Sequence, residues 1–128
     1  FGSEDVIKSL PGHRAVGHVR YSTAGGKGLR NVQPLFADFE FGGLAIAHNG
    51  NLTNAYQLRR TLVERGNIFQ STSDTEVIIH LMAISTAGHV IDRLIEAFCQ
   101  NIEPLLGKCS TYSYRTFIME GANFLFAY

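Results

Sequence analysis

Two apolar segments in residues 35–50 constrain the fold of this 128-residue chain more than any other feature. The first, LFADFEF (35–41), places acidic residues between apolar ones, and the second, GGLAIAHNG (42–50), is apolar over most of its length after two glycines. Alternation is typical of a strand with one solvated face, whereas a continuous apolar run is typical of a buried strand. These residues therefore predict a β-hairpin whose second strand is largely buried.

Three helices are predicted after the hairpin. In residues 54–66, Ala55, Leu58, Leu62 and Val63 recur at helical spacing, and Gly66 stands where a left-handed C-cap is expected.

In residues 71–85, Ser73 and Glu76 have the spacing of a capping box, which predicts a helix start, with Asp74 in the first turn. The third helix is predicted from Val90 to about Ile102. Its apolar side comprises Ile91, Leu94, Ile95 and Phe98.

The remaining segments give weaker patterns. A short helix is predicted to end between Val6 and Leu10, and a strand is predicted at Ala15–Tyr21, where β-branched and aromatic residues gather. The glycine-rich residues 24–34 predict a loop. Residues 108–128 are rich in aromatic side chains and are compatible with one or two strands. Nothing along the chain resembles a linker between two domains.

The charge balance narrows the classes of partner. Eleven basic and eleven acidic residues leave no basic patch for nucleic acid or for an anionic membrane, and no apolar run approaches the roughly 20 residues that span a bilayer. The two cysteines, Cys99 and Cys109, lack metal-ligand spacing, and the five histidines are scattered. We therefore expect a cytoplasmic domain with no metal site, and a small-molecule or protein partner.

The polar segment AHNGNLTN (47–54) has two interpretations. Asparagine and glycine suit the positive-φ positions of a turn, with Thr53 or Asn54 capping the next helix. Alternatively, the side-chain amide of Asn49 and the backbone N–H of Gly50 form an oxyanion hole, for which a glycine lets reacting atoms approach the backbone closely.

Three further residues have a similar choice of roles. Arg20 lies late in the predicted strand, where its guanidinium could bind a carboxylate or form a surface ion pair. Thr23 follows the strand and could add a hydroxyl to the same carboxylate site. Asp74 could favour the helix dipole or hold an ammonium group of a ligand. Together with Asn49 and Gly50, these residues would suit an amino acid attacked at its side-chain carbonyl.

Four motifs in series, GHVRYSTAG, LRNVQP, AHNGNLTN and STSDTEVIIHL, resemble the class II glutamine amidotransferase domain. Residues 1–98 are identified as part of such a domain, whereas residues 99–128 do not match the family. The resemblance implies an α+β fold of the N-terminal nucleophile hydrolase type, with two antiparallel sheets between helical layers, incomplete in this chain. It is strongest to the members that serve purine synthesis.

The resemblance also implies roles for the residues singled out above. Arg20 and Thr23 would bind the α-carboxylate of L-glutamine, Asp74 would bind its α-ammonium group, and Asn49 with Gly50 would form the oxyanion hole. In the family an N-terminal cysteine attacks the side-chain carbonyl and releases ammonia. A phosphoribosyltransferase domain of the same parent chain, where Mg²⁺ is expected, then uses the ammonia to make phosphoribosylamine. The parent is expected to be a homo-oligomer.

Two departures from the family bear on activity. Neither Cys99 nor Cys109 matches the nucleophile, so the chain as given is expected to be inactive alone and to hold no cofactor. It also lacks the phosphoribosyltransferase domain, which favours an internal piece of a longer enzyme. The alternative is a relic that binds an amino acid or a protein without catalysis. In either case we expect an unpaired sheet edge and incomplete cover over Ile46.

Overall fold

A computed structural model describes residues 3–9, 16–19 and 28–98, and the backbone of two strands at 115–120 and 123–127. Strands and helices are both present, which confirms the α+β class, and the predicted second sheet is not part of the described residues. The elements are α1 (Glu4–Lys8), the 3₁₀ helix η1 (Leu29–Asn31), β1 (Leu35–Phe39), β2 (Gly42–Asn49), α2 (Ala55–Glu64), α3 (Thr75–Ile84), α4 (Val90–Glu96), β3 (Arg115–Glu120) and β4 (Asn123–Ala127).

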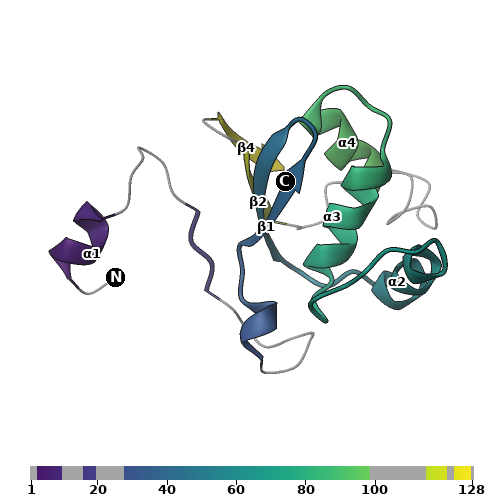
Figure 1. Ribbon diagram of the computed structural model, residues 1–128, viewed down its shortest axis with the longest axis horizontal. Coiled ribbons are helices and arrows are strands. Elements are labelled where there is room, and N and C mark those ends of the chain that lie inside the picture. Colours follow the sequence, from purple (N-terminus) through teal and green to yellow (C-terminus); the bar gives the residue numbers. More distant parts are fainter. Residues whose placement is uncertain (1–2, 10–15, 20–27, 99–114, 121–122, 128) are drawn as a thin grey trace.

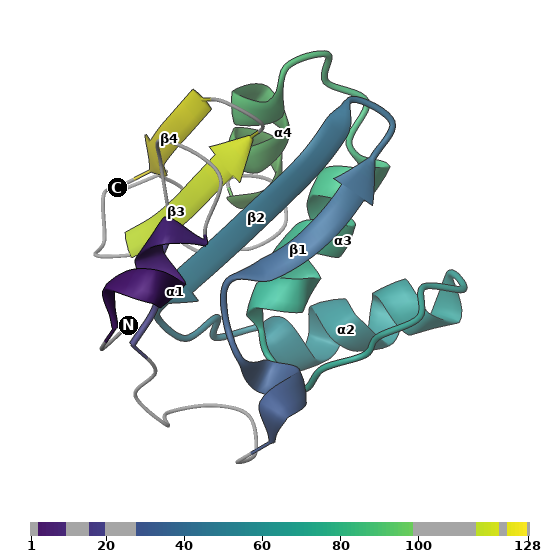
Figure 2. The ribbon, with the colours of Figure 1, turned by 60° about the vertical axis from the view of Figure 1, so that its left-hand side comes forward.

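The described strands form one antiparallel sheet in the order β1-β2-β3-β4. The predicted hairpin is confirmed, with Phe39 opposite Gly42 at the turn, where the φ of +125° at Gly42 requires a glycine. The one or two strands expected near the C-terminus are confirmed as β3 and β4. Helices α3 and α4 lie on one side of the sheet (Figure 1 and Figure 2). Helix α2 lies near the end of the sheet at which β2 ends and the chain continues toward α2.

The core forms between β2 and the inward face of α3. Leu44 and Ile46 of β2 are fully buried against a cluster that includes Ile78 and Met82 of α3. The expectation that Ile46 would be incompletely covered is wrong, because its exposed fraction is 0%. Helix α3 therefore covers β2, whose apolar side chains are stabilised by removal from water.

The α2 helix and its C-terminus are confirmed. The helix ends at Glu64, and Gly66 has a φ of +93°, the left-handed conformation expected of a residue beyond the C-cap. Leu62 is buried, but its neighbour Val63 is 53% exposed. The buried stripe of α2 is therefore narrower than the sequence spacing indicates.

Two predictions about secondary structure need correction. Residues Val16–Val19, inside the predicted strand at 15–21, have no strand hydrogen bonding in the described structure, and Val19 is exposed. The propensity of valine for strands depends on a pairing partner, which no described strand supplies here. The predicted loop at 24–34 contains the short helix η1. Helix α1 ends at Lys8, close to the expected position.

The predicted apolar face of α4 is half wrong. Leu94 is buried and Phe98 packs on the core, but Ile91 and Ile95 are exposed. The buried positions are Val90, Leu94 and Ala97, which recur at the helical repeat and belong to the core cluster. The α-helix is described to Glu96, and Ala97 and Phe98 continue it in π-helical conformation. The rest of the predicted extent, from residue 99 to Ile102, lies outside the described residues.

Within the described part of the chain, no helix combines the length and the apolar character needed to cross a membrane.

Burial of Ile46 predicts a large effect of its truncation on stability. Ile46→Ala should lower the free energy of unfolding by about 2–5 kcal/mol, because it leaves a cavity beneath α3. Urea denaturation followed by circular dichroism measures this change. Ile68→Ala is the matched control, since Ile68 is 82% exposed, and an equal loss in both variants would contradict the described core.

The environment of His80 on α3 predicts a pH dependence of stability. Burial lowers the pKa of His80 below its ordinary value of 6.5, although the Glu76 charge partly opposes the shift. The folded state thus disfavours the imidazolium, so the contribution of His80 is complete above pH 6.5 and is lost as the pH falls below it.

Thermal melts between pH 7.5 and 5 should therefore show a falling Tm in the wild type and a smaller fall in His80→Gln. Identical pH profiles for the two proteins would contradict this account.

Candidate functional site

The predicted site residue Asp74 is the residue immediately before α3, and its carboxylate is nearly buried. Its Oδ2 accepts a hydrogen bond of 3.0 Å from the backbone N–H of Leu52, and its Oδ1 lies 3.8 Å from Nδ1 of His48. Burial alone would raise the pKa of Asp74, but the His48 side chain and the Leu52 N–H together bring that pKa below its ordinary value of 3.8. Asp74 is therefore a buried anion at neutral pH.

Asn49 and Gly50 lie on the segment that contacts Asp74. Asn49 is the last residue of β2 and is exposed, and half-buried Gly50 follows it. Two residues further on, the N–H of Leu52 binds the carboxylate of Asp74. The turn after β2 therefore brings Asn49 and Gly50 to the neighbourhood of Asp74. Arg20 and Thr23 lie outside the described residues.

The turn interpretation of AHNGNLTN is only partly supported. Asn54 occupies the N-cap position of α2, but its side chain makes no capping hydrogen bond, and the described backbone bonds of this turn run from Ala55 N–H to Leu52 and from Leu58 N–H to Asn54. The segment therefore leads into α2 without a capping hydrogen bond from the Asn54 side chain.

The predicted capping box at α3 needs correction. The Ser73 hydroxyl accepts a hydrogen bond of 3.2 Å from the N–H of Thr75 rather than of Glu76. The Glu76 carboxylate accepts instead from the N–H groups of Gln70 and Ser71, at 2.8 Å and 2.7 Å, and from the hydroxyl of Ser71 at 2.7 Å. A buried carboxylate needs several donors, and the two consecutive N–H groups of the preceding loop supply them.

Asn31 of η1 holds the same loop from another side. Its side-chain amide donates to the hydroxyl of Thr72 and accepts from the backbone N–H of Thr72, both at 2.8 Å. Asn31 is 1% exposed, and a buried amide without hydrogen-bond partners would lower the free energy of unfolding. These two bonds give the amide its partners. The contact joins two segments 41 residues apart.

Arg59 of α2 supplies the donors for the carbonyl groups of this loop. Its guanidinium donates to the carbonyl of Ser71 at 2.9 Å and to that of Ser73 at 3.1 Å. The guanidinium carbon also lies 4.0 Å from the centre of the Phe69 ring, within range of a cation–π interaction. We name residues 70–73, together with Asn31, Arg59 and Glu76, the loop clamp.

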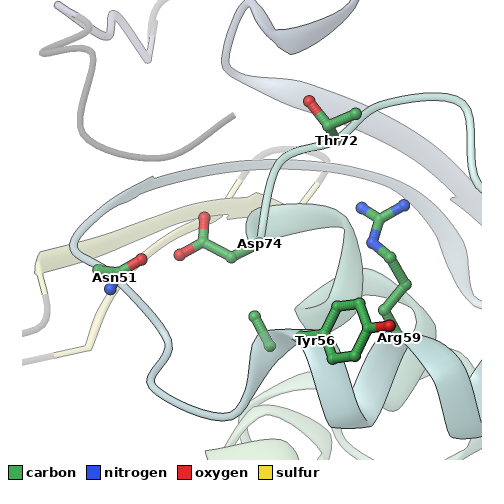
Figure 3. A pocket seen from close by; sticks show the side chains of 6 residues that line it. Asn51, Tyr56, Arg59, Thr72 and Asp74 are labelled. Atoms are coloured by element: carbon green, nitrogen blue, oxygen red, sulfur yellow. The ribbon is translucent and has the colours of Figure 1, made fainter. Parts of the chain in front are cut away.

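A pocket of about 290 Å³ adjoins Asp74 on the side of α2. This volume is at the lower end of the roughly 300–1,000 Å³ typical of small-molecule sites. Figure 3 shows Arg59 projecting from α2 toward Thr72, and Asp74 turned toward Asn51. Asn49 and Gly50 are not among the lining residues, which are Asn51, Ala55, Tyr56, Arg59, Thr72 and Asp74.

Most of these residues have no distinguishing signal in the sequence. Arg59 is followed by another arginine on a surface helix, and nothing in its spacing distinguishes it from Arg60, which makes an exposed ion pair with Glu64. Asn31 belongs to the motif LRNVQP, but its position in that motif does not indicate that it contacts Thr72. Among the described residues, no group of three or more histidine, cysteine, aspartate or glutamate side chains is arranged to hold a metal ion.

Several known proteins are similar in sequence to this chain. The amidophosphoribosyltransferase of Rhizobium etli is 57% identical over 95 residues, which are 74% of this chain and 19% of that protein. Amidophosphoribosyltransferase 2, chloroplastic, of Arabidopsis thaliana is 50% identical over 101 residues, which are 79% of this chain and 18% of that protein. The chain thus spans about a fifth of the length of these relatives.

A solved structure has a similar fold. The glutamine phosphoribosylpyrophosphate amidotransferase of B. subtilis, complexed with ADP and GMP, superposes with a TM-score of 0.64 at 39% identity, over 80% of this chain and 20% of that one. The sequence profile described as glutamine amidotransferase domain matches residues 18–102, well over half of the chain. The chain therefore belongs to the glutamine amidotransferase domain family.

Proposed function

We propose that the chain is the glutamine-binding part of an amidophosphoribosyltransferase. The parent enzyme would release ammonia from L-glutamine and pass it to a phosphoribosyltransferase domain, which makes 5-phosphoribosylamine from phosphoribosyl pyrophosphate for purine synthesis. The names of the relatives and the match over most of this chain support the assignment. The single structural observation that carries it is the buried carboxylate of Asp74 at the edge of a pocket.

The chemistry of Asp74 suits an ammonium ligand. A carboxylate with a lowered pKa stays charged at neutral pH, and burial increases its attraction for a cation that replaces water beside it. The N–H of Leu52 donates one hydrogen bond to Oδ2. A carboxylate oxygen has two lone pairs, so both oxygens of Asp74 can still accept a hydrogen bond from a ligand. Asp74 would bind the α-ammonium group of glutamine, and Arg20 with Thr23 would bind its α-carboxylate.

The remaining step requires a stabilised oxyanion and a nucleophile. Asn49 and Gly50, at the exposed end of β2, would donate to the oxygen of the tetrahedral intermediate. Neither Cys99 nor Cys109 matches the nucleophile position of the family, so we propose that the chain by itself binds glutamine without hydrolysing it.

The wider context of the parent is part of the same proposal. We propose that its N-terminal nucleophile hydrolase domain has two facing sheets, of which the described sheet is one, and that residues 99–128 diverge from the family. A homo-oligomeric, cytoplasmic parent with Mg²⁺ in the phosphoribosyltransferase domain is the simplest arrangement, although relatives in plants are chloroplastic.

Substitution of Asp74 tests the proposal. Asp74→Asn keeps the shape and an acceptor for Leu52 but removes the charge, so the Kd for L-glutamine should rise about 10- to 100-fold, as is typical for a lost charged hydrogen bond. Isothermal titration measures the change. Because the pKa of Asp74 lies below 3.8, wild-type binding should not weaken through Asp74 between pH 8 and 5.

Asp92→Asn is the matched control, since Asp92 lies exposed on α4. Circular dichroism checks that each variant is folded. Equal affinity of the wild type and Asp74→Asn, or no binding by the folded wild-type chain, would refute the assignment of glutamine binding to this chain.

A further inference from the structure

The loop before Asp74 obtains its hydrogen bonds from side chains, because residues 70–73 belong to no helix or strand. Glu76 accepts from the N–H groups of Gln70 and Ser71, and Asn31 accepts from that of Thr72. These acceptors hold the N–H groups of the loop. The carbonyl groups need a donor, and Arg59 provides it for Ser71 and Ser73.

The arrangement depends on the shape of the arginine side chain. One nitrogen of the guanidinium, Nη1, reaches the Ser71 carbonyl at 2.9 Å, and the other, Nη2, reaches the Ser73 carbonyl at 3.1 Å. The Phe69 ring lies against the same group at 4.0 Å and fixes its plane. Lysine has the charge but not the planar pair of donors, so it cannot reproduce both bonds in one rigid geometry.

Arg59 is connected to Asp74 by a short path. The Ser73 carbonyl that accepts from Nη2 belongs to the peptide group that also contains the N–H of Asp74. The Asp74 carboxylate accepts a hydrogen bond of 3.0 Å from the Leu52 N–H. A shift of the Ser73–Asp74 peptide would turn the Asp74 side chain away from that N–H. Both side chains line the same pocket, Arg59 from α2 and Asp74 from the start of α3 (Figure 3).

We infer that Arg59 is a positioning residue for the ammonium site: its two hydrogen bonds to the Ser71 and Ser73 carbonyls fix the peptide before Asp74 and so orient the Asp74 carboxylate. This inference rests on the proposed function for its ligand, and on the described contacts for the orientation itself. It predicts that loss of the paired donors weakens recognition of the ammonium group even when charge and fold are retained.

Isothermal titration with L-glutamine tests the effect on binding. Arg59→Lys should raise the Kd about tenfold, the size expected from a disturbed charged hydrogen bond. In an Asp74→Asn background the same substitution should have no further effect, because both changes act through one carboxylate. Arg60→Lys, on the next residue of α2 with an exposed ion pair, should leave the Kd unchanged.

A second ligand separates positioning from general loosening. The probe 4-carbamoylbutanoic acid has the side-chain amide and the carboxylate of glutamine but no α-ammonium group. Arg59→Lys should therefore reduce the preference for glutamine over this probe, whereas a purely structural role would leave the preference unchanged. Phe69→Leu is the substitute variant if Arg59→Lys does not fold. It retains Arg59 but removes the ring beneath it, so it should reduce the preference for glutamine by a smaller factor.

Amide hydrogen exchange measured by NMR without ligand separates this inference from the proposed function. If Arg59 orients Asp74, the Leu52 N–H should exchange about tenfold faster in Arg59→Lys than in Arg60→Lys, because it loses its acceptor. Faster exchange with no glutamine binding in the wild type would support the positioning role and reject the proposed ligand. Unchanged Leu52 exchange in folded Arg59→Lys and Phe69→Leu would overturn the inference, whatever the binding result.

Discussion

The buried carboxylate of Glu76 is the group on which the geometry of the candidate site depends. It lies in the first turn of α3 and accepts two backbone N–H groups and one hydroxyl from residues 70–71. A charge in this position is tolerated only if donors surround it, so the loop must fold back over the helix start. The same loop then meets Asn31 and Arg59, and its last peptide leads directly into Asp74.

The site forms where three elements meet. The end of β2 carries Asn49 and Gly50, the turn beyond it offers the N–H of Leu52, and the start of α3 presents Asp74. The hydrogen bond between Leu52 and Asp74 joins the two loops across 22 residues of sequence. The proposed oxyanion donors and the proposed ammonium acceptor are thereby placed on neighbouring loops supported by one core.

The position of the pocket adds a distinction within this site. Its lining includes Asp74 but neither Asn49 nor Gly50, so the pocket extends from the carboxylate toward α2. The pocket therefore adjoins the proposed ammonium site and is not lined by the proposed oxyanion donors. The orientation of the Asp74 carboxylate then depends on the loop clamp. The side chains that hold the loop come from η1, α2 and α3.

Local pattern was sufficient for the elements that are defined by neighbouring residues. The hairpin at 35–49, the α2 helix with Gly66 after it, and the start of α4 at Val90 all follow from spacing and backbone preference within a few residues. Local pattern also placed a polar set at the end of β2. The strand predicted at 15–21 was wrong over Val16–Val19, because a strand is defined by a partner that lies elsewhere in the chain.

The tertiary structure decided which polar groups meet. Sequence spacing paired Glu76 with Ser73, but burial of Glu76 directs its carboxylate to Gln70 and Ser71, where two N–H groups are available. The partners of Asn31 and Arg59 are equally invisible in the sequence, since they are set by packing between segments far apart along the chain. The sequence alone determined the residue types and the elements of this site, and only long-range packing determined its contacts, because hydrogen-bond partners depend on distance in space rather than along the chain.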